Sequence, residues 1–380
     1  MAALLSTAVL LLLVSESLAA PSSIQKRGIR SAAHRYIPSR AAVDNETGAV
    51  YNNFDGGGWV IPVLIGGQQV TLNLDTGSSD LWTASTLMSS DSQSTVTTGE
   101  IYDPSKSSTY QAMDGFTFAL GYADGSGASG PAAMESINIG GATVPNMPFG
   151  VCDTLKYGGD GTGTRDTDGP VGLGFGVENS IRPNPQCTFM ECLEPYVPEP
   201  VFSTSFKTNN SGYIDFGYSD SSAYSGDLTT IPIANTSEGN EGQWVYQGVQ
   251  FGSGGSVFDA AAFDLDFDSG TSSLSVSADV AAAYFGLIQG SSNSSGSWQY
   301  PCGSTLPDLD FIFNSASSGP TTVTIPGANL KNGDASTGDC GTWMNVVTGR
   351  GNAGIPFYIT KYMIWNQAVP ELSFADQADN

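Results

Sequence analysis

The chain has 380 residues and carries 13 Lys and Arg against 37 Asp and Glu, a formal net charge of −24 at pH 7. So strong a negative charge disfavours contact with a phosphate backbone, and we expect no nucleic-acid partner. The only histidine is His34, so the rest of the sequence offers no Ser-His-Asp or Cys-His catalysis and no histidine-ligated metal site. We therefore expect neither a metal nor an organic cofactor. The length allows two domains.

Residues 1–19 have the pattern of a secretory signal peptide, with an apolar core and small residues before a predicted cleavage site after Ala19. The apolar core is too short to span a membrane, and no longer apolar run follows, so we expect no membrane anchor. The expected location is outside the cell, with the vacuole as the alternative. Four Asn-x-Ser/Thr glycosylation sites agree with export: Asn45, Asn209, Asn235 and Asn293.

Residues 20–40 contain five of the 13 basic residues and none of the 37 acidic ones. We interpret this segment as a propeptide whose positive charge neutralises an acidic cleft. The alternative is an N-terminal arm without a function of its own. The remaining chain has few basic groups, so protonation of its carboxylates leaves little positive charge, which suits an enzyme that works in acid.

A strand pattern that ends in an aspartate occurs twice, about half the chain apart. Apolar and polar side chains alternate over residues 70–74, and the run ends in Asp75-Thr76-Gly77-Ser78. The same alternation over residues 263–267 ends in Asp268-Ser269-Gly270-Thr271. One such motif alone is as typical of a structural turn. Two copies at this spacing predict a duplicated protein with one site where its halves meet.

Two aspartates brought together in this way have a specific chemistry. Carboxyl groups about 3 Å apart cannot both ionise, so the pair shares one proton. One group can then activate a water molecule while the other protonates a carbonyl oxygen. The hydroxyls of Ser78 and Thr271 are close enough in sequence to hydrogen-bond the two carboxyls, and the glycines allow a substrate backbone to approach.

The paired motifs Asp-Thr-Gly-Ser-Ser and Asp-Ser-Gly-Thr-Ser resemble those of pepsin-type aspartic proteases, in particular secreted fungal ones. The resemblance covers residues 55–376. It implies an all-β, bilobal fold, with lobes at 41–220 and 221–380 and the cleft between them. It also implies a monomeric endopeptidase that cuts proteins and peptides in acid, prefers hydrophobic residues around the scissile bond, and uses Asp75 and Asp268 as its catalytic pair.

The resemblance assigns roles to further residues. Thr76 and Ser269 interlock the lobes beneath the site, Ser78 and Thr271 support the carboxyls, and Trp82 orders the flap described below. The implied substrate-binding residues are Gly77, Trp82, Tyr122, Ala123, Asp124, Gly270 and Ser272.

Apolar residues alternate along 116–120, and a glycine-rich tip follows at 122–127. This pattern by itself indicates a β-hairpin. By resemblance this hairpin is the flap over the substrate, with Tyr122 at its aromatic position and Ala123 where the family commonly has Gly. In some fungal relatives an acid at the position of Asp124 admits a substrate Lys to the pocket before the scissile bond. Alternatively, Asp124 only forms the turn.

Asp264 and Asp266 lie on the same strand face as Asp268, and we interpret them as a solvated face rather than part of a metal cluster. Two other functions were weighed. A silent binding protein on this fold would be indicated by loss of an aspartate or of Tyr122, and neither is lost. A glycosidase would hold its two carboxyls about 5–9.5 Å apart.

Five cysteines leave one unpaired in a secreted chain. The resemblance implies a Cys302–Cys340 disulfide. Cys187 and Cys192 can close a small loop and leave Cys152 free, but either can also pair with Cys152.

Two segments are expected to cross behind the catalytic strands. Residues 168–174 resemble the segment behind Asp75. The second segment departs from the family at Asn352-Ala353-Gly354, which predicts weaker support behind Asp268. Residues 354–358 and 372–375 resemble closing strands, and 281–287 is the best candidate for a helix.

Overall fold

The computed structural model describes residues 29–35, 58–159, 161–207, 211–234, 242–294, 296–315, 319–333 and 338–378. The predicted signal peptide, most of the predicted propeptide and the sites at Asn45, Asn209 and Asn235 lie outside these residues. Asn293 is exposed on a short strand. Within the described ranges, no helix is long and apolar enough to cross a membrane.

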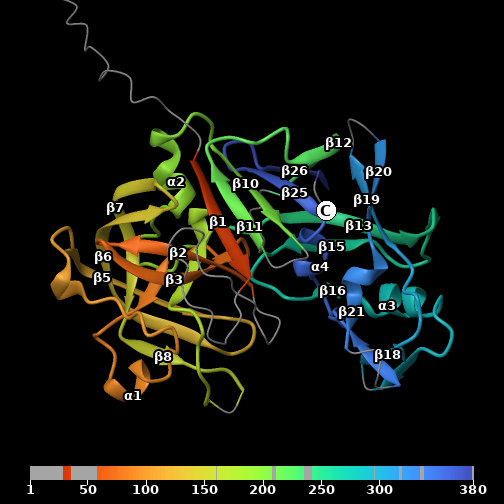
Figure 1. Cartoon of the computed structure of the whole chain (residues 1–380), viewed down its shortest axis with the longest axis horizontal. Coiled ribbons are helices and arrows are strands. Elements are labelled where there is room, and N and C mark those ends of the chain that lie inside the picture. The colour runs from red at the N-terminus through yellow and green to blue at the C-terminus, as the bar shows by residue number, and fades with distance from the viewer. Residues whose placement is uncertain are drawn as a thin grey trace, which may run out of the picture.

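Strands dominate both halves of the chain, which lie side by side (Figure 1). The first half contains β2 (Trp59–Ile65), β3 (Gln68–Asp75), β4 (Trp82–Ala84), α1 (Ser90–Gln93), β5 (Gln111–Gly121), β6 (Gly127–Ile139), β7 (Ala142–Cys152), β8 (Thr154–Lys156), β9 (Gly169–Gly172) and α2 (Phe189–Leu193). The second contains β13 (Val245–Ser253), β14 (Ser256–Val257), β15 (Phe263–Phe267), β16 (Leu274–Val276), α3 (Ala278–Phe285), β17 (Ser292–Ser294), β18 (Ser297–Pro301), β19 (Leu309–Ser315), β20 (Gly319–Ile325), β21 (Lys331–Asn332), β22 (Asp339–Thr342), β23 (Met344–Val346), β24 (Gly351–Ala353) and α4 (Ile355–Tyr358). The predicted all-β fold with two lobes is confirmed.

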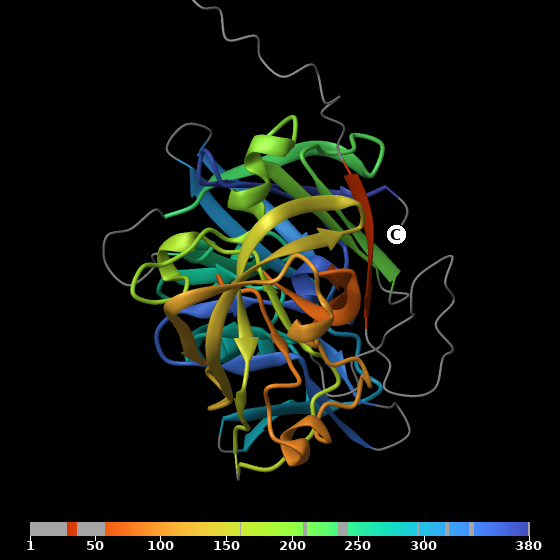
Figure 2. The ribbon, with the colours of Figure 1, turned by 90° about the vertical axis from the view of Figure 1, so that its left-hand side faces the viewer.

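A set of strands in the order β12-β26-β25-β10-β11-β1 joins the lobes. Its members are β1 (Ile29–Arg35), β10 (Val201–Phe206), β11 (Ser211–Phe216), β12 (Tyr224–Pro232), β25 (Lys361–Asn366) and β26 (Glu371–Gln377). β10 from the first half pairs antiparallel with β25 from the second. β1 belongs to the predicted propeptide and runs antiparallel to β11, as Figure 2 shows. Part of that segment is therefore a strand of the joining sheet.

Most predicted elements are present, and one is wrong. The alternating run at 70–74 lies within β3, and α3 covers most of the predicted helix at 281–287. Residues 372–375 lie within β26. The predicted strand at 354–358 is instead the short helix α4, which has Pro356 in its first turn. Proline has no N–H for a strand ladder but is well tolerated where a helix begins.

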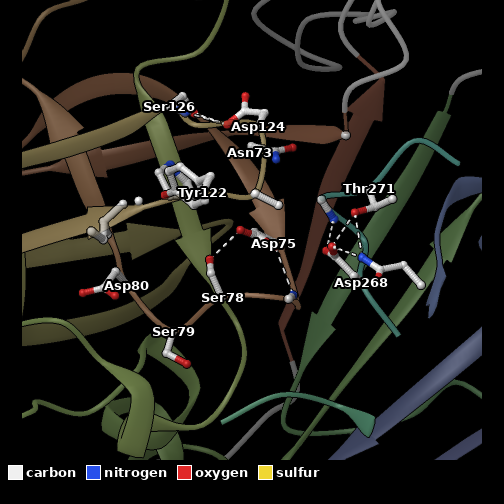
Figure 3. Close-up of a pocket in the computed structure, with 18 of the residues that line it drawn as sticks. Asn73, Asp75, Ser78, Ser79, Asp80, Tyr122, Asp124, Ser126, Asp268 and Thr271 are labelled. Atoms are coloured by element: carbon white, nitrogen blue, oxygen red, sulfur yellow. Dashed lines mark hydrogen bonds between the residues drawn. The ribbon is translucent and has the colours of Figure 1, made fainter. Parts of the chain in front are cut away.

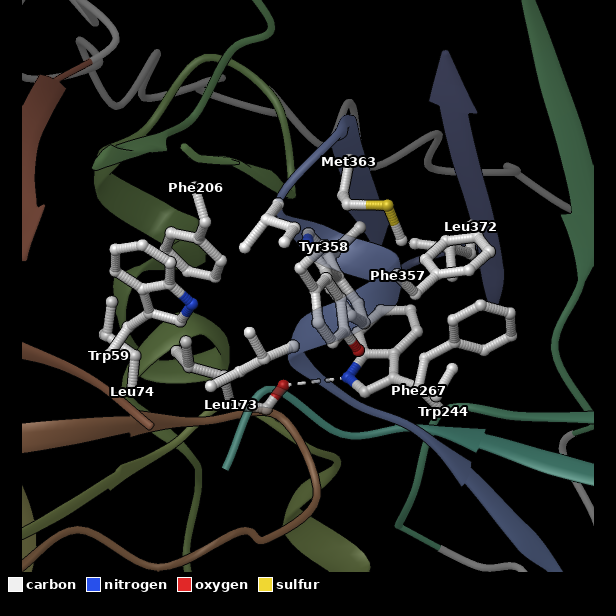
Figure 4. Packing of buried hydrophobic residues seen from close by; sticks show 14 of the residues in the cluster. Trp59, Leu74, Leu173, Phe206, Trp244, Phe267, Phe357, Tyr358, Met363 and Leu372 are labelled. Carbon is white, nitrogen blue, oxygen red and sulfur yellow. Dashed lines mark hydrogen bonds between the residues drawn. The ribbon is translucent and has the colours of Figure 1, made fainter. Parts of the chain in front are cut away.

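Aromatic side chains pack beside the strand ends that bear Asp75 and Asp268 (Figure 4). Trp59 stacks on Phe206 with ring centroids 4.6 Å apart. Trp244 from the second half donates its indole N–H to the carbonyl of Leu173 in the first, at 3.0 Å. The first contact lies within the first half and the second crosses between the halves, and such packing holds the strand ends that bear Asp75 and Asp268 in a fixed relation.

The cysteines form two disulfides, Cys302–Cys340 and Cys187–Cys192, and Cys152 is free and buried. The Cys302–Cys340 disulfide implied by the resemblance is confirmed. Of the pairings left open among the other three cysteines, the structure has Cys187–Cys192, which closes the small loop.

Candidate active site

Asp75 and Asp268 meet where β3 and β15 end (Figure 3). Their approach depends on the two motif glycines. A Cβ atom on Gly77 would lie 2.4 Å from Cγ of Asp268, and one on Gly270 would lie 2.6 Å from Oδ1 of Asp75. Any other residue would push the opposite carboxyl away. Gly77 and Gly270 therefore make room for the carboxyl pair, a role that the sequence analysis did not assign to them.

Each carboxyl has the same set of hydrogen-bond donors. The Ser78 hydroxyl donates to Oδ2 of Asp75 at 2.5 Å, and the Thr271 hydroxyl donates to Oδ2 of Asp268 at 2.5 Å. The backbone N–H of Gly77 donates to Asp75 at 3.0 Å, and that of Gly270 donates to Asp268 at 2.8 Å. The duplicated sequence thus gives a near-symmetric pair.

Thr76 and Ser269 connect the two strand ends from beneath. The Thr76 hydroxyl donates to the carbonyl of Phe267 at 2.8 Å and accepts from the N–H of Ser269 at 2.9 Å. The Ser269 hydroxyl donates to the carbonyl of Leu74 at 2.8 Å and accepts from the N–H of Thr76 at 3.1 Å. Four buried hydrogen bonds between the lobes fix the spacing of the carboxyls, as the resemblance implied.

The charge of the pair is set by burial and by proximity. Asp75 is only 9% exposed. Its burial, followed by the charge of Asp268, raises the pKa of Asp75 well above its ordinary value. The hydrogen bonds from Ser78 and Gly77 act in the opposite direction but do not cancel this effect. The two carboxyls approach the same point, since a Cβ atom on Gly270 would lie 2.6 Å from Oδ1 of Asp75 and 3.1 Å from Oδ1 of Asp268. The pair therefore retains a proton in acid.

A family model for eukaryotic aspartyl proteases matches residues 59–377. The chain belongs to this family. Endothiapepsin of Cryphonectria parasitica is 32% identical over 332 residues, which are 84% of this chain and 75% of that relative. Penicillopepsin-1 of Penicillium janthinellum is 31% identical over 327 residues, covering 84% and 95%.

Podosporapepsin of Podospora anserina is 36% identical over 257 residues, which span 67% of this chain but only 58% of that relative. The crystal structure of an aspartic proteinase from Irpex lacteus has a TM-score of 0.69 and covers 93% of this chain and 97% of its own. At 18% identity, that likeness supports the fold alone. With the family match, these relatives make the chain an aspartic endopeptidase of the pepsin type.

The hairpin predicted to be the flap is formed by β5 and β6, which pair antiparallel. The indole N–H of Trp82 donates to the Tyr122 hydroxyl at 2.9 Å, which is the contact expected of a tryptophan that orders the flap. Trp82 also stacks on Phe118, with centroids 6.3 Å apart. The guanidinium of Arg165 lies 5.2 Å from the centroid of the Trp82 ring. Sequence reasoning missed Arg165, because no motif surrounds it.

At the flap tip, Asp124 forms the turn. Its Oδ1 accepts hydrogen bonds from the N–H and the hydroxyl of Ser126, at 2.8 and 2.6 Å. Partial burial acts to raise the pKa of Asp124, but the Ser126 hydrogen bonds outweigh it and hold that pKa below its ordinary value. The Asp124 side chain is exposed. Asp124, Ala123 and Ser272 all line the cleft. Both of these hydrogen bonds use Oδ1, so the turn does not use the other carboxylate oxygen.

The expected weakness behind Asp268 is wrong. β24 pairs in parallel with β15, as β9 does with β3, and Ala353 is fully buried. The Asn352 amide donates to Oδ2 of Asp268 and to the Thr271 hydroxyl, both at 3.2 Å. A polar side chain thus supports Asp268 where an apolar one was expected. This contact follows from the register of β24 against β15, which the local sequence does not show.

The predicted solvated face is also wrong for Asp266, which is only 3% exposed. β15 is an inner strand of its sheet, with β13 and β24 along its edges, and other parts of the chain cover the face at Asp266. Asp264 is partly exposed and accepts a hydrogen bond from the N–H of Gly248 at 3.1 Å. The alternating sequence correctly puts Asp264 and Asp266 on one face of β15, but it does not show that this face is covered at Asp266.

Proposed function

We propose that this protease hydrolyses peptide bonds in acid with a water molecule activated by Asp75 and Asp268, which share one proton. The observation that carries the proposal is the pair of adjacent carboxyls at Gly77 and Gly270, with matching hydrogen-bond donors on each side. It lies in a cleft of about 1010 Å³ that is lined by both lobes.

The pair supplies both proton transfers that the reaction needs. The ionised carboxyl takes a proton from water as the water oxygen attacks the peptide carbonyl carbon. The protonated carboxyl gives its proton to the carbonyl oxygen, which yields a neutral tetrahedral intermediate. The carboxyl that received the water's proton then passes it to the leaving nitrogen. The C–N bond breaks, and the other carboxyl takes a proton back from a hydroxyl of the intermediate.

The alternatives have less support. A glycosidase holds its carboxyls about 5–9.5 Å apart, with room between them for a water molecule or a sugar ring. Here oxygens of both carboxyls crowd the space at Gly270. A silent binding protein has no use for a buried pair with matched donors, and Tyr122 is held by Trp82 as a working flap requires.

A pH–rate profile tests this function. Activity on a denatured protein substrate should be greatest in acid and should fall as the raised pKa of the pair is passed and its last proton leaves. The profile is measured as kcat/KM from pH 2.5 to 8 in buffers of constant ionic strength. A maximum above pH 7 would contradict the mechanism.

The first-lobe side of the cleft includes Leu120 and Tyr122, which favour a hydrophobic substrate side chain before the scissile bond. Asp124 is proposed to admit Lys there as well, through the carboxylate oxygen that the turn does not use.

Asp124→Ser tests that second role and keeps a turn-forming side chain. We expect kcat/KM for a peptide with Lys before the scissile bond to fall about tenfold relative to the matched Leu peptide, since buried Lys needs a partner. Both peptides are assayed with wild type and variant at pH 4. Equal losses for both would leave Asp124 as a turn-former only.

Residues 20–40 are proposed as an inhibitory propeptide. Their positive charge complements a cleft lined by seven acids and two arginines, and residues 29–35 already form β1 of the joining sheet. Export through residues 1–19 and a monomeric state complete the proposal.

A further inference from the structure

The two catalytic carboxyls have the same motif donors but differ in one further contact. Each accepts hydrogen bonds from the hydroxyl three residues later and from the N–H of its motif glycine (Figure 3). Among the described residues, only Asp268 has a further donor from outside the two motifs. The amide nitrogen of Asn352 lies 3.2 Å from Oδ2 of Asp268 and 3.2 Å from the hydroxyl oxygen of Thr271, which donates to the same Oδ2. Two side chains therefore donate to Oδ2 of Asp268, whereas Ser78 alone donates to Oδ2 of Asp75.

Strand pairing explains why the second lobe has this donor and the first does not. Asn352 on β24 lies opposite Asp266, and Pro170 on β9 lies opposite Asn73. Asp266 and Asn73 each precede a catalytic aspartate by two residues. Asn352 and Pro170 thus occupy equivalent positions in the duplicated halves. Proline has no side-chain donor, so the first lobe cannot form the contact.

The amide of Asn352 is held in place by strands on both sides. β24 pairs with β15 along one edge and with β16 along the other, where Asn352 lies opposite Ser275. Its two neighbours in the strand are buried, and Asn352 itself is partly buried in the lining of the cleft. An amide N–H is a donor, and a hydrogen bond to a carboxylate stabilises the ionised form. The contact therefore favours a negative charge on Asp268 over one on Asp75.

Three titratable side chains face the carboxyl pair from other positions: Asp266 of β15, Tyr358 of α4 and Tyr122 of the flap hairpin. Burial, followed by the charge of one catalytic aspartate, raises the pKa of each, so all three are uncharged in acid. They give neither carboxyl a compensating charge. The remaining charged groups of the cleft lining are Asp80, Asp124, Arg165, Asp166, Glu178 and Arg350. The variants described below leave all of these groups in place.

The burial of the pair acts in the same direction as the Asn352 contact. Burial, followed by the charge of Asp268, raises the pKa of Asp75, which is only 9% exposed. Within a pair that shares one proton, the group with the raised pKa keeps the proton while its partner is ionised. The hydrogen bonds and the burial thus both favour a proton on Asp75.

We propose that Asn352 is a positioning residue that keeps the negative charge of the catalytic pair on Asp268. Asp268 is then the base that takes a proton from water as the water oxygen attacks the peptide carbonyl carbon. Asp75 is the acid that gives its proton to the carbonyl oxygen. When the C–N bond breaks, Asp268 passes the water's proton to the leaving nitrogen, and Asp75 takes a proton back from a hydroxyl of the intermediate. This inference rests on the proposed peptidase function and assigns its two roles to particular residues.

Asn352→Leu tests the proposal, because leucine has nearly the shape of asparagine but no donor. The value of kcat/KM must fall at low pH, where the base becomes protonated. Without the amide, the midpoint of this acid limb should rise by about one pH unit, and kcat/KM on the limb should fall by about tenfold. The profile is measured from about pH 1.5 to pH 6 at constant ionic strength, on a peptide with blocked ends and no titratable side chain.

Two further variants separate the loss of the donor from a change in packing. Asn352→Ala removes the amide without filling its space and should shift the acid limb in the same direction. Asn345→Leu is the matched control, because the Asn345 amide donates to the Ser273 hydroxyl at 2.8 Å in the same lobe but lies outside the cleft lining. It should keep the wild-type acid limb. Circular dichroism shows that each variant is folded at the pH of the assay.

An acid limb that stays in place in both Asn352 variants would overturn the proposal, as would a limb that moves to lower pH. An equal fall of kcat/KM at every pH would also overturn it, because loss of a merely structural contact does not change the ionisation of the pair. The wild-type profile tests the peptidase function separately. If the wild type does not cleave the peptide in acid, the peptidase function itself is wrong.

Discussion

Asp75→Asn or Asp268→Asn should lower kcat/KM by at least about 10³-fold while leaving the fold intact. The amide fills the same space next to Gly270 or Gly77, but it can neither take the proton from water nor share one with its partner. The measurement is single-turnover cleavage at pH 4 with circular dichroism of both variants.

Asp264→Asn serves as the control for loss of a nearby acid, because its side chain is outside the cleft lining and accepts a hydrogen bond from Gly248 of β13. It should retain wild-type turnover. Wild-type turnover by either catalytic variant would contradict the assignment of the pair.

The second large effect concerns stability. Burial raises the pKa of Asp168 to about 7, although the hydrogen bonds donated by Thr71 and Thr98 act to lower that pKa. Burial also raises the pKa values of Asp80 and Asp266. A carboxyl whose folded-state pKa is raised stabilises the fold below its unfolded pKa, near 3.8, and loses that contribution as pH rises through the folded value. The protein should therefore be most stable in acid and weaken between pH 4 and pH 7.5.

A shift of one pKa unit corresponds to about 1.4 kcal/mol, and each kcal/mol moves Tm by about 2–4 °C in a domain of about 150–250 residues. Tm should fall by at least about 5 °C from pH 4 to pH 7.5, as measured by calorimetry. Asp168→Asn, which keeps an acceptor for Thr71, should reduce that fall. A Tm that is flat or rises over this range would contradict the account.

The parts of the site that sequence could predict are those encoded within a few residues of each aspartate. Ser78 and Thr271 are three residues from their carboxyls, and Thr76 and Ser269 adjoin them, so two strand-end motifs determine these contacts once the strands meet.

The parts that sequence could not predict depend on neighbours that are distant in the chain. Alternation predicts a solvated Asp266 because it shows which side chains share a face, not which distant parts of the chain cover that face. The local sequence at Asn352 predicts weaker support for Asp268. The opposite is found because the pairing of β24 with β15 brings the Asn352 amide to Asp268, which is 84 residues away in the sequence. The same limit applies to Arg165, whose contact with Trp82 follows from tertiary packing alone.

Titration with a statine-containing peptide, whose hydroxyl occupies the place of the attacking water, tests the central claim most directly. At pH 4, activity on a protein substrate should fall linearly to zero at one inhibitor per enzyme molecule. Asp75→Asn and Asp268→Asn should bind the same peptide far more weakly, because they lack the shared proton. Protein cleavage that persists at saturating inhibitor would show that another site performs the reaction and would contradict the account.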